Sequence, residues 1–177
     1  IIDSFYPGAR GGKAVAEAIF GDFSPSGKLP VTFYQGTENL PEFTDYDMSD
    51  RTYRYTDKNV LYPFGYGLHY GTIRYENAQI SCAQCSVRDA VDVSVDVINE
   101  SSYTIHESVQ AYIQHEEADA YEPGYQLKGI QTVTLQPKET KRVTISLKAR
   151  DFAIITQEGE CVVRPGSYRI AIGGQQP

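Results

Sequence analysis

The sequence contains no tryptophan, a single methionine and only three cysteines among its 177 residues. It also lacks basic character, because 16 lysines and arginines stand against 23 acidic residues and leave a net charge of −7. A surface that binds nucleic acid or an anionic membrane needs concentrated positive charge. No apolar run reaches the roughly 20 residues of a membrane-spanning helix. We therefore expect no nucleic-acid or membrane partner, and the composition is that of a globular protein.

The three cysteines, Cys82, Cys85 and Cys161, form an odd set. A disulfide-stapled secreted domain usually has an even and denser set, so we expect free thiols and a cytoplasmic, bacterial-type setting. No signal peptide opens the chain, although secretion stays open if a leader precedes Ile1. Cys82 and Cys85 have the spacing of a zinc knuckle, with Cys161 and either His106 or His115 as further ligands. A structural zinc site usually needs a second close pair, so we predict no metal.

The first part of the chain has the order of an α/β unit. Ile1–Phe5 is apolar and is predicted to be a buried strand, and the glycine-rich stretch Tyr6–Gly12 is predicted to be a loop. Lys13–Phe20 is rich in good helix formers, and Gly21 stands where a helix would end. One strand and one helix cannot bury both their faces. We therefore expect the last unit of a larger sheet domain whose remainder lies outside this sequence.

The stretch from Phe23 to Tyr70 combines many turn residues with many aromatic ones. It is too aromatic for a disordered linker, so we expect an ordered, irregular connection that packs its rings against neighbouring domains. Lys28–Phe33 could hold a short edge strand. Arg51 and Arg54 are expected to tie the connection down through hydrogen bonds to backbone or carboxylate groups.

The remainder of the chain changes to a period of two. Val91 to Val97 alternate with polar residues, which predicts a half-buried strand, and three later segments repeat this pattern. About seven short strands over roughly 100 residues, separated by turn signals, are typical of a β-sandwich. We expect a mainly β protein, with an α/β end and connection over residues 1–71 and a sandwich over residues 72–177. The later alternating segments centre on Val109–Ile113, Val143–Leu147 and Tyr168–Ile172.

Several motifs in a fixed order resemble glycoside hydrolase family 3. Tyr6–Gly12 followed by Ala18–Asp22 resembles the last βα unit of that family's second domain. Asp22–Phe33 is close to the family pattern almost letter for letter, and Leu61–Leu68 resembles the entry into its fibronectin type III-like domain. Three later stretches resemble recurring features of that domain, so the resemblance spans nearly the whole chain. They are Ser108–Ile113, Leu127–Gly129 and Val163–Tyr168.

The resemblance implies a parent enzyme that is a retaining glycosidase, with a carboxylate nucleophile and a carboxylic general acid. In this family the nucleophile lies in an N-terminal barrel and the acid/base lies upstream of the Tyr6–Gly8 loop. Neither motif occurs here, so we predict no catalytic residue in this chain and expect it to be inactive alone. The segment Arg51–Tyr55 looks more like the β-xylosidase and arabinosidase branch than the β-glucosidases.

Arg10 is the one residue that we predict to contact substrate, because a loop after an α/β strand lies at the ligand-binding edge of such sheets. A surface salt bridge is its alternative. We expect the acidic residues Glu116, Glu117, Asp119 and Glu122 to form a solvated loop. Calcium binding at Asp45, Asp47 and Asp50 is disfavoured because the spacing is irregular. The tyrosines could stack on sugars, but domain packing explains them as well: Tyr46, Tyr53, Tyr55, Tyr62, Tyr66 and Tyr70.

Two functions remain open at this point. In the first, the chain is the C-terminal scaffold of a β-xylosidase or β-glucosidase, its partners being the upstream barrel and α/β domains, with carbohydrate bound by the parent. In the second, it is a stand-alone sandwich module that binds carbohydrate or protein. The absence of tryptophan weakens a sugar-binding platform, because flat aromatic faces usually supply it. We expect no cofactor, and a homo-oligomer is possible.

Overall fold

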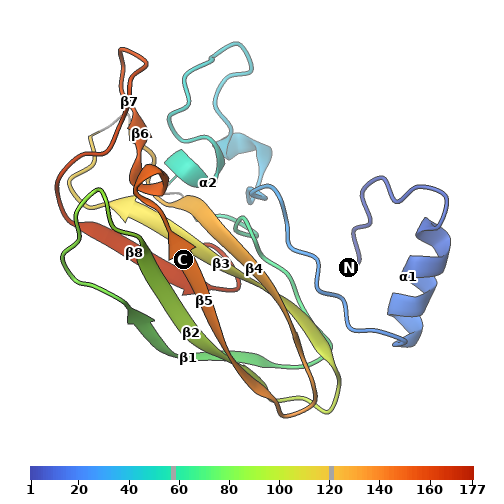
Figure 1. Ribbon diagram of the computed structural model, residues 1–177. Helices are drawn as coiled ribbons and strands as arrows, with labels where there is room; N and C mark the ends of the chain where they lie inside the picture. The colour runs from blue at the N-terminus through green and yellow to red at the C-terminus, as the bar shows by residue number, and fades with distance from the viewer. Residues whose placement is uncertain (57–58, 120–121) are drawn as a thin grey trace.

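The computed structural model describes residues 1–56, 59–119 and 122–177. A β-sandwich forms the body of the molecule, and the N-terminal helix stands to one side of it (Figure 1). No helix among the described residues is long and apolar enough to cross a membrane. The helices are α1 (Gly11–Phe20), η1 (Thr37–Asn39), α2 (Thr52–Tyr55) and η2 (Ala149–Phe152). The strands are β1 (Ile73–Ile80), β2 (Val91–Asn99), β3 (Ile105–His115), β4 (Gln126–Leu135), β5 (Thr140–Leu147), β6 (Ile154–Ile155), β7 (Cys161–Val162) and β8 (Tyr168–Gly173).

Two antiparallel three-stranded sheets face each other, one in the order β1-β2-β5 and the other in the order β4-β3-β8. The four alternating segments that we predicted as strands lie in β2, β3, β5 and β8. The inward side chains of β2, β3 and β5, with Leu135 of β4, form the buried core, and side chains of β8 pack against it. The buried members of this core are Val91, Val93, Val95, Val97, Val109, Ala111, Ile113, Leu135, Val143, Ile145 and Leu147.

The connection lies over the outer face of the β4-β3-β8 sheet. Tyr53 stacks on Phe64 with ring centroids 4.2 Å apart and meets the buried Tyr112 of β3 edge-on at 6.2 Å. The backbone of Gly65 approaches β3 so closely that a Cβ atom would lie 2.3 Å from Gln110 Oε1. The expected order of this segment is thus confirmed, and its rings pack on the sandwich.

The predicted edge strand at Lys28–Phe33 is wrong. Only Phe33 makes a strand-like pairing, an isolated bridge to Tyr62. Leu29 instead forms backbone hydrogen bonds with Gly65 and Tyr66, which holds this stretch against the Tyr62–Gly67 turn. Pro30 has no backbone N–H to continue a ladder, which accounts for the interruption.

The predicted helix is present as α1, and Gly21 ends it in the left-handed conformation, with φ of 83°. The hydroxyl of Tyr70 donates to the Ala18 carbonyl at 2.6 Å and joins the helix to the end of the connection. The predicted strand at Ile1–Phe5 is wrong for this chain: the segment is exposed, and Phe5 has a positive φ. A lone strand has no partner for its backbone groups, so it does not form here.

Candidate functional site

A buried carboxylate joins the connection to the sandwich. Glu107, on β3, has a side chain that is 1% exposed and lies between the two sheets. Lys28 Nζ lies 2.9 Å from its Oε1, and His69 Nε2 lies 2.5 Å from its Oε2. Tyr75 of β1 donates its hydroxyl to Oε1 at 2.8 Å. One carboxylate thus receives contacts from three residues that all lie more than 30 positions before it in the sequence.

Burial and the neighbouring polar groups shift the pKa of Glu107 in opposite directions. Burial alone raises the pKa of this carboxyl, but contacts from His69, Lys28 and Tyr75 together hold the pKa below its ordinary value. Burial and the neighbouring carboxylate raise the pKa of Tyr75, so its proton stays in place to donate. Glu107 is therefore an ionised anchor for Lys28 and His69. It is not a general acid, since that role needs a raised pKa.

A second buried carboxylate corrects the expectation of a solvated acidic loop. Glu116, Glu117 and Asp119 are exposed, but the side chain of Glu122 is 2% exposed. Its Oε2 lies 2.9 Å from His115 Nδ1, and its Oε1 pairs with Arg164. Arg164 also pairs with Asp119 at 3.0 Å. The prediction is wrong for Glu122 because a cation and a histidine distant in the sequence compensate its burial.

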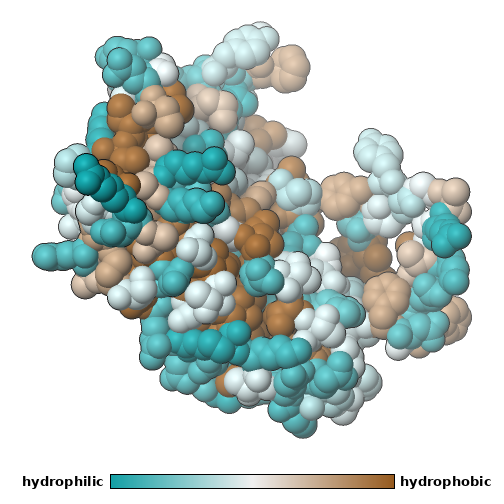
Figure 2. Space-filling view, viewed as in Figure 1, coloured by the Kyte–Doolittle hydropathy of each residue, from teal (hydrophilic) through white to brown (hydrophobic). Residues whose placement is uncertain are grey.

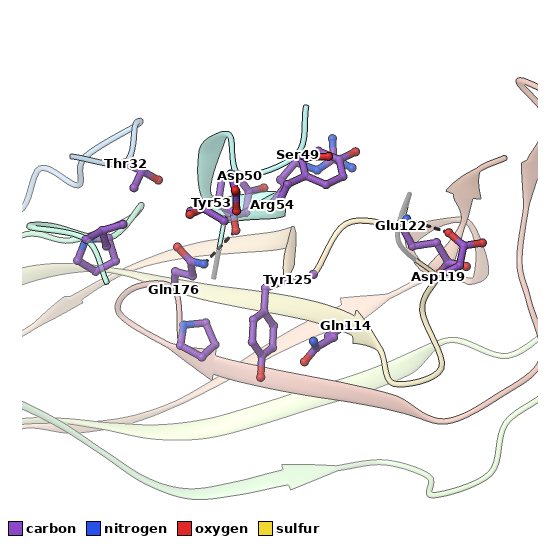
Figure 3. A pocket seen from close by; sticks show the side chains of 16 residues that line it. Thr32, Ser49, Asp50, Tyr53, Arg54, Gln114, Asp119, Glu122, Tyr125 and Gln176 are labelled. Carbon is purple, nitrogen blue, oxygen red and sulfur yellow. Dashed lines mark hydrogen bonds between the residues drawn. The ribbon is translucent and has the colours of Figure 1, made fainter. Parts of the chain in front are cut away.

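A cleft of about 630 Å³ lies between the connection and the outer face of the β4-β3-β8 sheet. Figure 3 shows the Ser49–Arg54 segment on one side of it and Gln114, Tyr125 and Gln176 on the sheet side. Arg54 is half-buried in the wall of the cleft, and its Nη2 donates to Gln126 Oε1 at 3.1 Å. Glu122 and Asp119 close the far end. The volume is that of an ordinary small-molecule site.

Arg10, the predicted substrate contact, lies immediately before α1 and is exposed. Its carbonyl accepts the first helical hydrogen bond, from Ala14, and its side chain has no partner among the described residues. It does not line the cleft. The role of Arg10 in substrate binding therefore stays a prediction.

Arg51 behaves as expected, whereas the guanidinium of Arg54, among the described residues, ties the connection down through the side-chain amide of Gln126 and not through a backbone or carboxylate group. The guanidinium of Arg51 donates to the backbone carbonyls of Glu42, Asp45 and Asp47 and so holds that loop together. Among the tyrosines, Tyr62 stacks on Tyr66 at 4.9 Å, whereas Tyr46 is largely exposed. Packing accounts for Tyr53, Tyr62 and Tyr66 within this chain, and it does not account for Tyr46.

The expectation of free thiols is wrong for two of the three cysteines. Cys82 and Cys85 form a disulfide, and Cys161 is free and exposed. The turn after β1 brings the two Cα atoms to 6.3 Å, which is within the reach of a disulfide. An odd count does not forbid one pair and one free thiol. The cytoplasmic setting, which leaned on that count, stays a prediction. Among the described residues no group of three or more ligand-type side chains could hold a metal.

Two domain families match this chain. Residues 1–70 match the glycosyl hydrolase family 3 C-terminal domain, and residues 107–176 match a fibronectin type III-like domain. The chain is 36% identical to a β-xylosidase of Formosa agariphila and 35% identical to a xylan 1,4-β-xylosidase of Xylanibacter ruminicola, over 98% of its own length. It spans 25% and 20% of these relatives.

Solved structures agree with this assignment. The chain superposes on a β-glucosidase from Erythrobacter marinus with a TM-score of 0.83 and 36% identity, over 98% of this chain and 23% of that one. A β-glucosidase from Listeria innocua in complex with glucose gives a TM-score of 0.81 and 27% identity, over 98% and 26%. The fold and these matches define the class: the chain corresponds to the C-terminal part of these longer relatives, where the family 3 C-terminal domain is followed by a fibronectin type III-like sandwich. It belongs to glycoside hydrolase family 3.

Proposed function

We propose that this chain is the structural C-terminal portion of a retaining β-glycosidase that releases terminal β-xylosyl or β-glucosyl residues. The names of the relatives, β-xylosidase and β-glucosidase, support this reaction class. Retaining hydrolysis needs two carboxyl groups about 5 Å apart, one as nucleophile and one as acid/base. The buried carboxylates Glu107 and Glu122 are each committed to cations, so we assign catalysis to the rest of the protein.

One observation carries the scaffold role: the apolar side chains around α1 face outward. Tyr6 is 98% exposed, Phe20 84% and Ile19 62%. Figure 2 shows apolar surface on this unit, to the right of the sandwich. Apolar clusters of this kind mark interaction surfaces. The occupant that we propose is the remainder of the α/β domain of the same protein, since the relatives are four to five times longer.

The contacts of Glu107 support the scaffold role, because they attach the connection to the sandwich. Lys28 follows the α1 unit and His69 ends the connection, and both are fixed on β3 through Glu107. The sandwich therefore holds both ends of the connection at defined positions. An α/β domain continuous with α1 would be positioned on the sandwich by these contacts.

Activity assays test the division of roles. The purified 177-residue chain should not hydrolyse an aryl β-xyloside or aryl β-glucoside, whereas the protein carrying its remaining domains should hydrolyse at least one of them. The longer protein with its predicted nucleophile replaced is the control for contaminating activity. Turnover by the short chain would overturn the proposal, and so would an inert longer protein that is folded.

The alternative, a stand-alone binding module, fits the structure less well. An independent sandwich would not need α1, whose apolar face lies open, or a connection anchored by a buried ion pair. We also propose Arg10 as a rim residue for substrate, because its exposed guanidinium has no partner among the described residues. In the complete protein, Arg10→Ala should raise KM with little change in kcat, and Arg10→Lys should restore part of the loss.

A further inference from the structure

The cleft described above follows from the alternation of side chains along β3. Gln110, Tyr112 and Gln114 point to the outer face of their sheet, while Val109, Ala111 and Ile113 point into the core. The connection covers the first two: Gln110 donates to the Gly65 carbonyl, and Tyr112 packs on Tyr53. It does not cover Gln114, which faces the cleft (Figure 3). The sheet therefore presents a polar side chain to a cavity that this chain forms by itself.

Several polar groups that line the cleft have unused hydrogen-bonding capacity. The Gln114 amide has no partner among the described residues, and Gln176 uses its Nε2 on the Tyr53 carbonyl, which leaves its amide oxygen. Thr32 Oγ1 and Arg54 Nε are buried and unpaired. Buried polar groups in folded proteins are rarely left without a partner. Donors and acceptors are thus both available along one cavity wall.

An aromatic surface accompanies these groups. Tyr125 lines the sheet side of the cleft. Tyr53 and Tyr55 line the opposite side, where the Arg54 guanidinium lies 5.8 Å from the centre of the Tyr55 ring. Flat rings beside mixed donors and acceptors match the two kinds of surface that a sugar presents, apolar C–H faces and peripheral hydroxyls.

The charge of the cleft restricts the ligand. Asp50, Asp119 and Glu122 line it, and Arg54 is the one cationic side chain among the described lining residues. Arg164 pairs with both Asp119 and Glu122, so these carboxylates are already compensated. An acidic or phosphorylated ligand would therefore find only Arg54 as a cationic partner among the described lining residues. Hydroxyl groups can donate to carboxylates and accept from the guanidinium and amides, so a neutral polyol is favoured.

We propose that this cleft is a binding site for a neutral oligosaccharide, with Gln114, Gln176 and Arg54 as hydrogen-bonding residues and Tyr125 as the stacking surface. The lining residues named above all belong to this chain. The site therefore adds a binding role to the scaffold role and is tested separately from it. A sugar bound there would bridge the connection and the sandwich, and so would also stabilise their contact.

Nuclear magnetic resonance titration of the 177-residue chain tests this site. Xylotriose and cellotriose are the neutral probes, and trigalacturonate is the anionic one. The side-chain amide signals of Gln114 and Gln176 should shift with either neutral probe, and trigalacturonate should leave them unchanged. Gln114→Ala should weaken binding about tenfold, because it removes direct hydrogen bonds. The matched control is Gln131→Ala, which removes an exposed amide from the neighbouring strand β4.

The Tyr125 ring is tested by a pair of variants. Tyr125→Ala should weaken binding severalfold and Tyr125→Phe should keep most of it, since the phenylalanine retains the stacking face. Thermal unfolding of each variant establishes that it is folded before titration. The proposal fails if neither neutral probe shifts the two amide signals, if Gln114→Ala binds like the Gln131→Ala control, or if trigalacturonate binds equally well. It also fails if the longer protein shows no response, because another domain then covers the cleft.

Discussion

The sandwich and the region around α1 use apolar side chains in opposite ways. In the sandwich, alternate residues of two sheets bury each other, and the core side chains of β2, β3 and β5 are nearly inaccessible. Around α1, the apolar side chains of Tyr6, Ile19 and Phe20 lie open. The sandwich therefore buries most of its core-facing apolar side chains by itself, whereas those around α1 are uncovered in this chain. This difference is the one expected between a folding unit and a piece of a larger sheet domain.

An ion pair as well as aromatic packing holds the connection between these regions on the sandwich. The Glu107 carboxylate contacts Lys28 near the start of the connection and His69 near its end, in a buried site. Substitutions in the two regions should therefore differ in their effect on stability, and we expect the largest loss at Glu107.

Glu107→Gln should break the link between the two regions. The substitution keeps the shape but removes the charge, which leaves Lys28 and His69 beside an amide in a buried site. We expect the free energy of unfolding to fall by about 3–5 kcal/mol, measured by urea denaturation. The control is Glu76→Gln, which removes an exposed carboxylate paired with Arg74 and should cost less than about 1 kcal/mol. Equal losses in the two variants would mean that Glu107 is no anchor.

The stability difference between the wild type and Glu107→Gln should also depend on pH. The folded-state pKa of Glu107 lies below the ordinary value of 4.5, so the unfolded chain binds the proton more tightly. The contribution of this carboxylate is thus fully present above about pH 4.5 and is lost as the pH falls through the lower folded-state value. Urea denaturation between pH 3 and pH 7 should show the stability difference between wild type and Glu107→Gln shrinking at the acid end. A constant difference would contradict the lowered pKa.

Leu147→Ala should show how firmly the sandwich core is packed. Leu147 is fully buried in β5, and truncation leaves a cavity that costs about 2–5 kcal/mol. Leu68→Ala is the matched change in the connection, where the side chain is 69% exposed, and should alter the free energy of unfolding by less than about 0.5 kcal/mol. Chemical denaturation of both variants measures the contrast. Similar values would remove the distinction between the regions.

Gly65→Ala should loosen the connection without touching the core. Gly65 has φ of 78°, and an added Cβ would lie 2.3 Å from Gln110 Oε1 and 2.9 Å from the Tyr112 hydroxyl. A non-glycine residue in this conformation costs about 1–3 kcal/mol. Gly27→Ala, where nothing lies within 4 Å of the new Cβ, is the control and should be neutral. Limited proteolysis should cut the connection faster in Gly65→Ala alone.

The sequence predicts the parts of this molecule whose contacts are local or periodic. Alternation locates β2, β3, β5 and β8 because one face of each packs on the core, and Gly21 marks the end of α1 because a left-handed residue is needed there. The edge strands β1 and β4 show no clean alternation, since their outer side chains are only partly covered.

The contacts of Glu107 and the cleft cannot be predicted from such local patterns. Glu107 meets Lys28 and His69 from 79 and 38 positions earlier in the chain, and Glu122 meets Arg164 from 42 positions later. A pattern in one segment carries no information about a partner at that separation. Glu122 therefore looks like any loop carboxylate until the fold places a cation beside it. The predicted strand at Ile1–Phe5 fails for the related reason that its partner strands are absent from this sequence.

Phe20→Ser should produce the smallest effect in this chain and a larger one in the complete protein. The side chain is 84% exposed at the end of α1, so the free energy of unfolding of the 177-residue chain should change by less than about 0.5 kcal/mol. In the protein that carries the remaining domains, the same change should lower the melting temperature and the yield of active enzyme, because a serine replaces a ring at the proposed contact. Val87→Ser, which alters an exposed apolar residue on a sandwich loop, should be neutral in both proteins. A large effect of Phe20→Ser in the short chain would show that the N-terminal region buries its own apolar surface after all, and the contrast between the two regions would then be wrong.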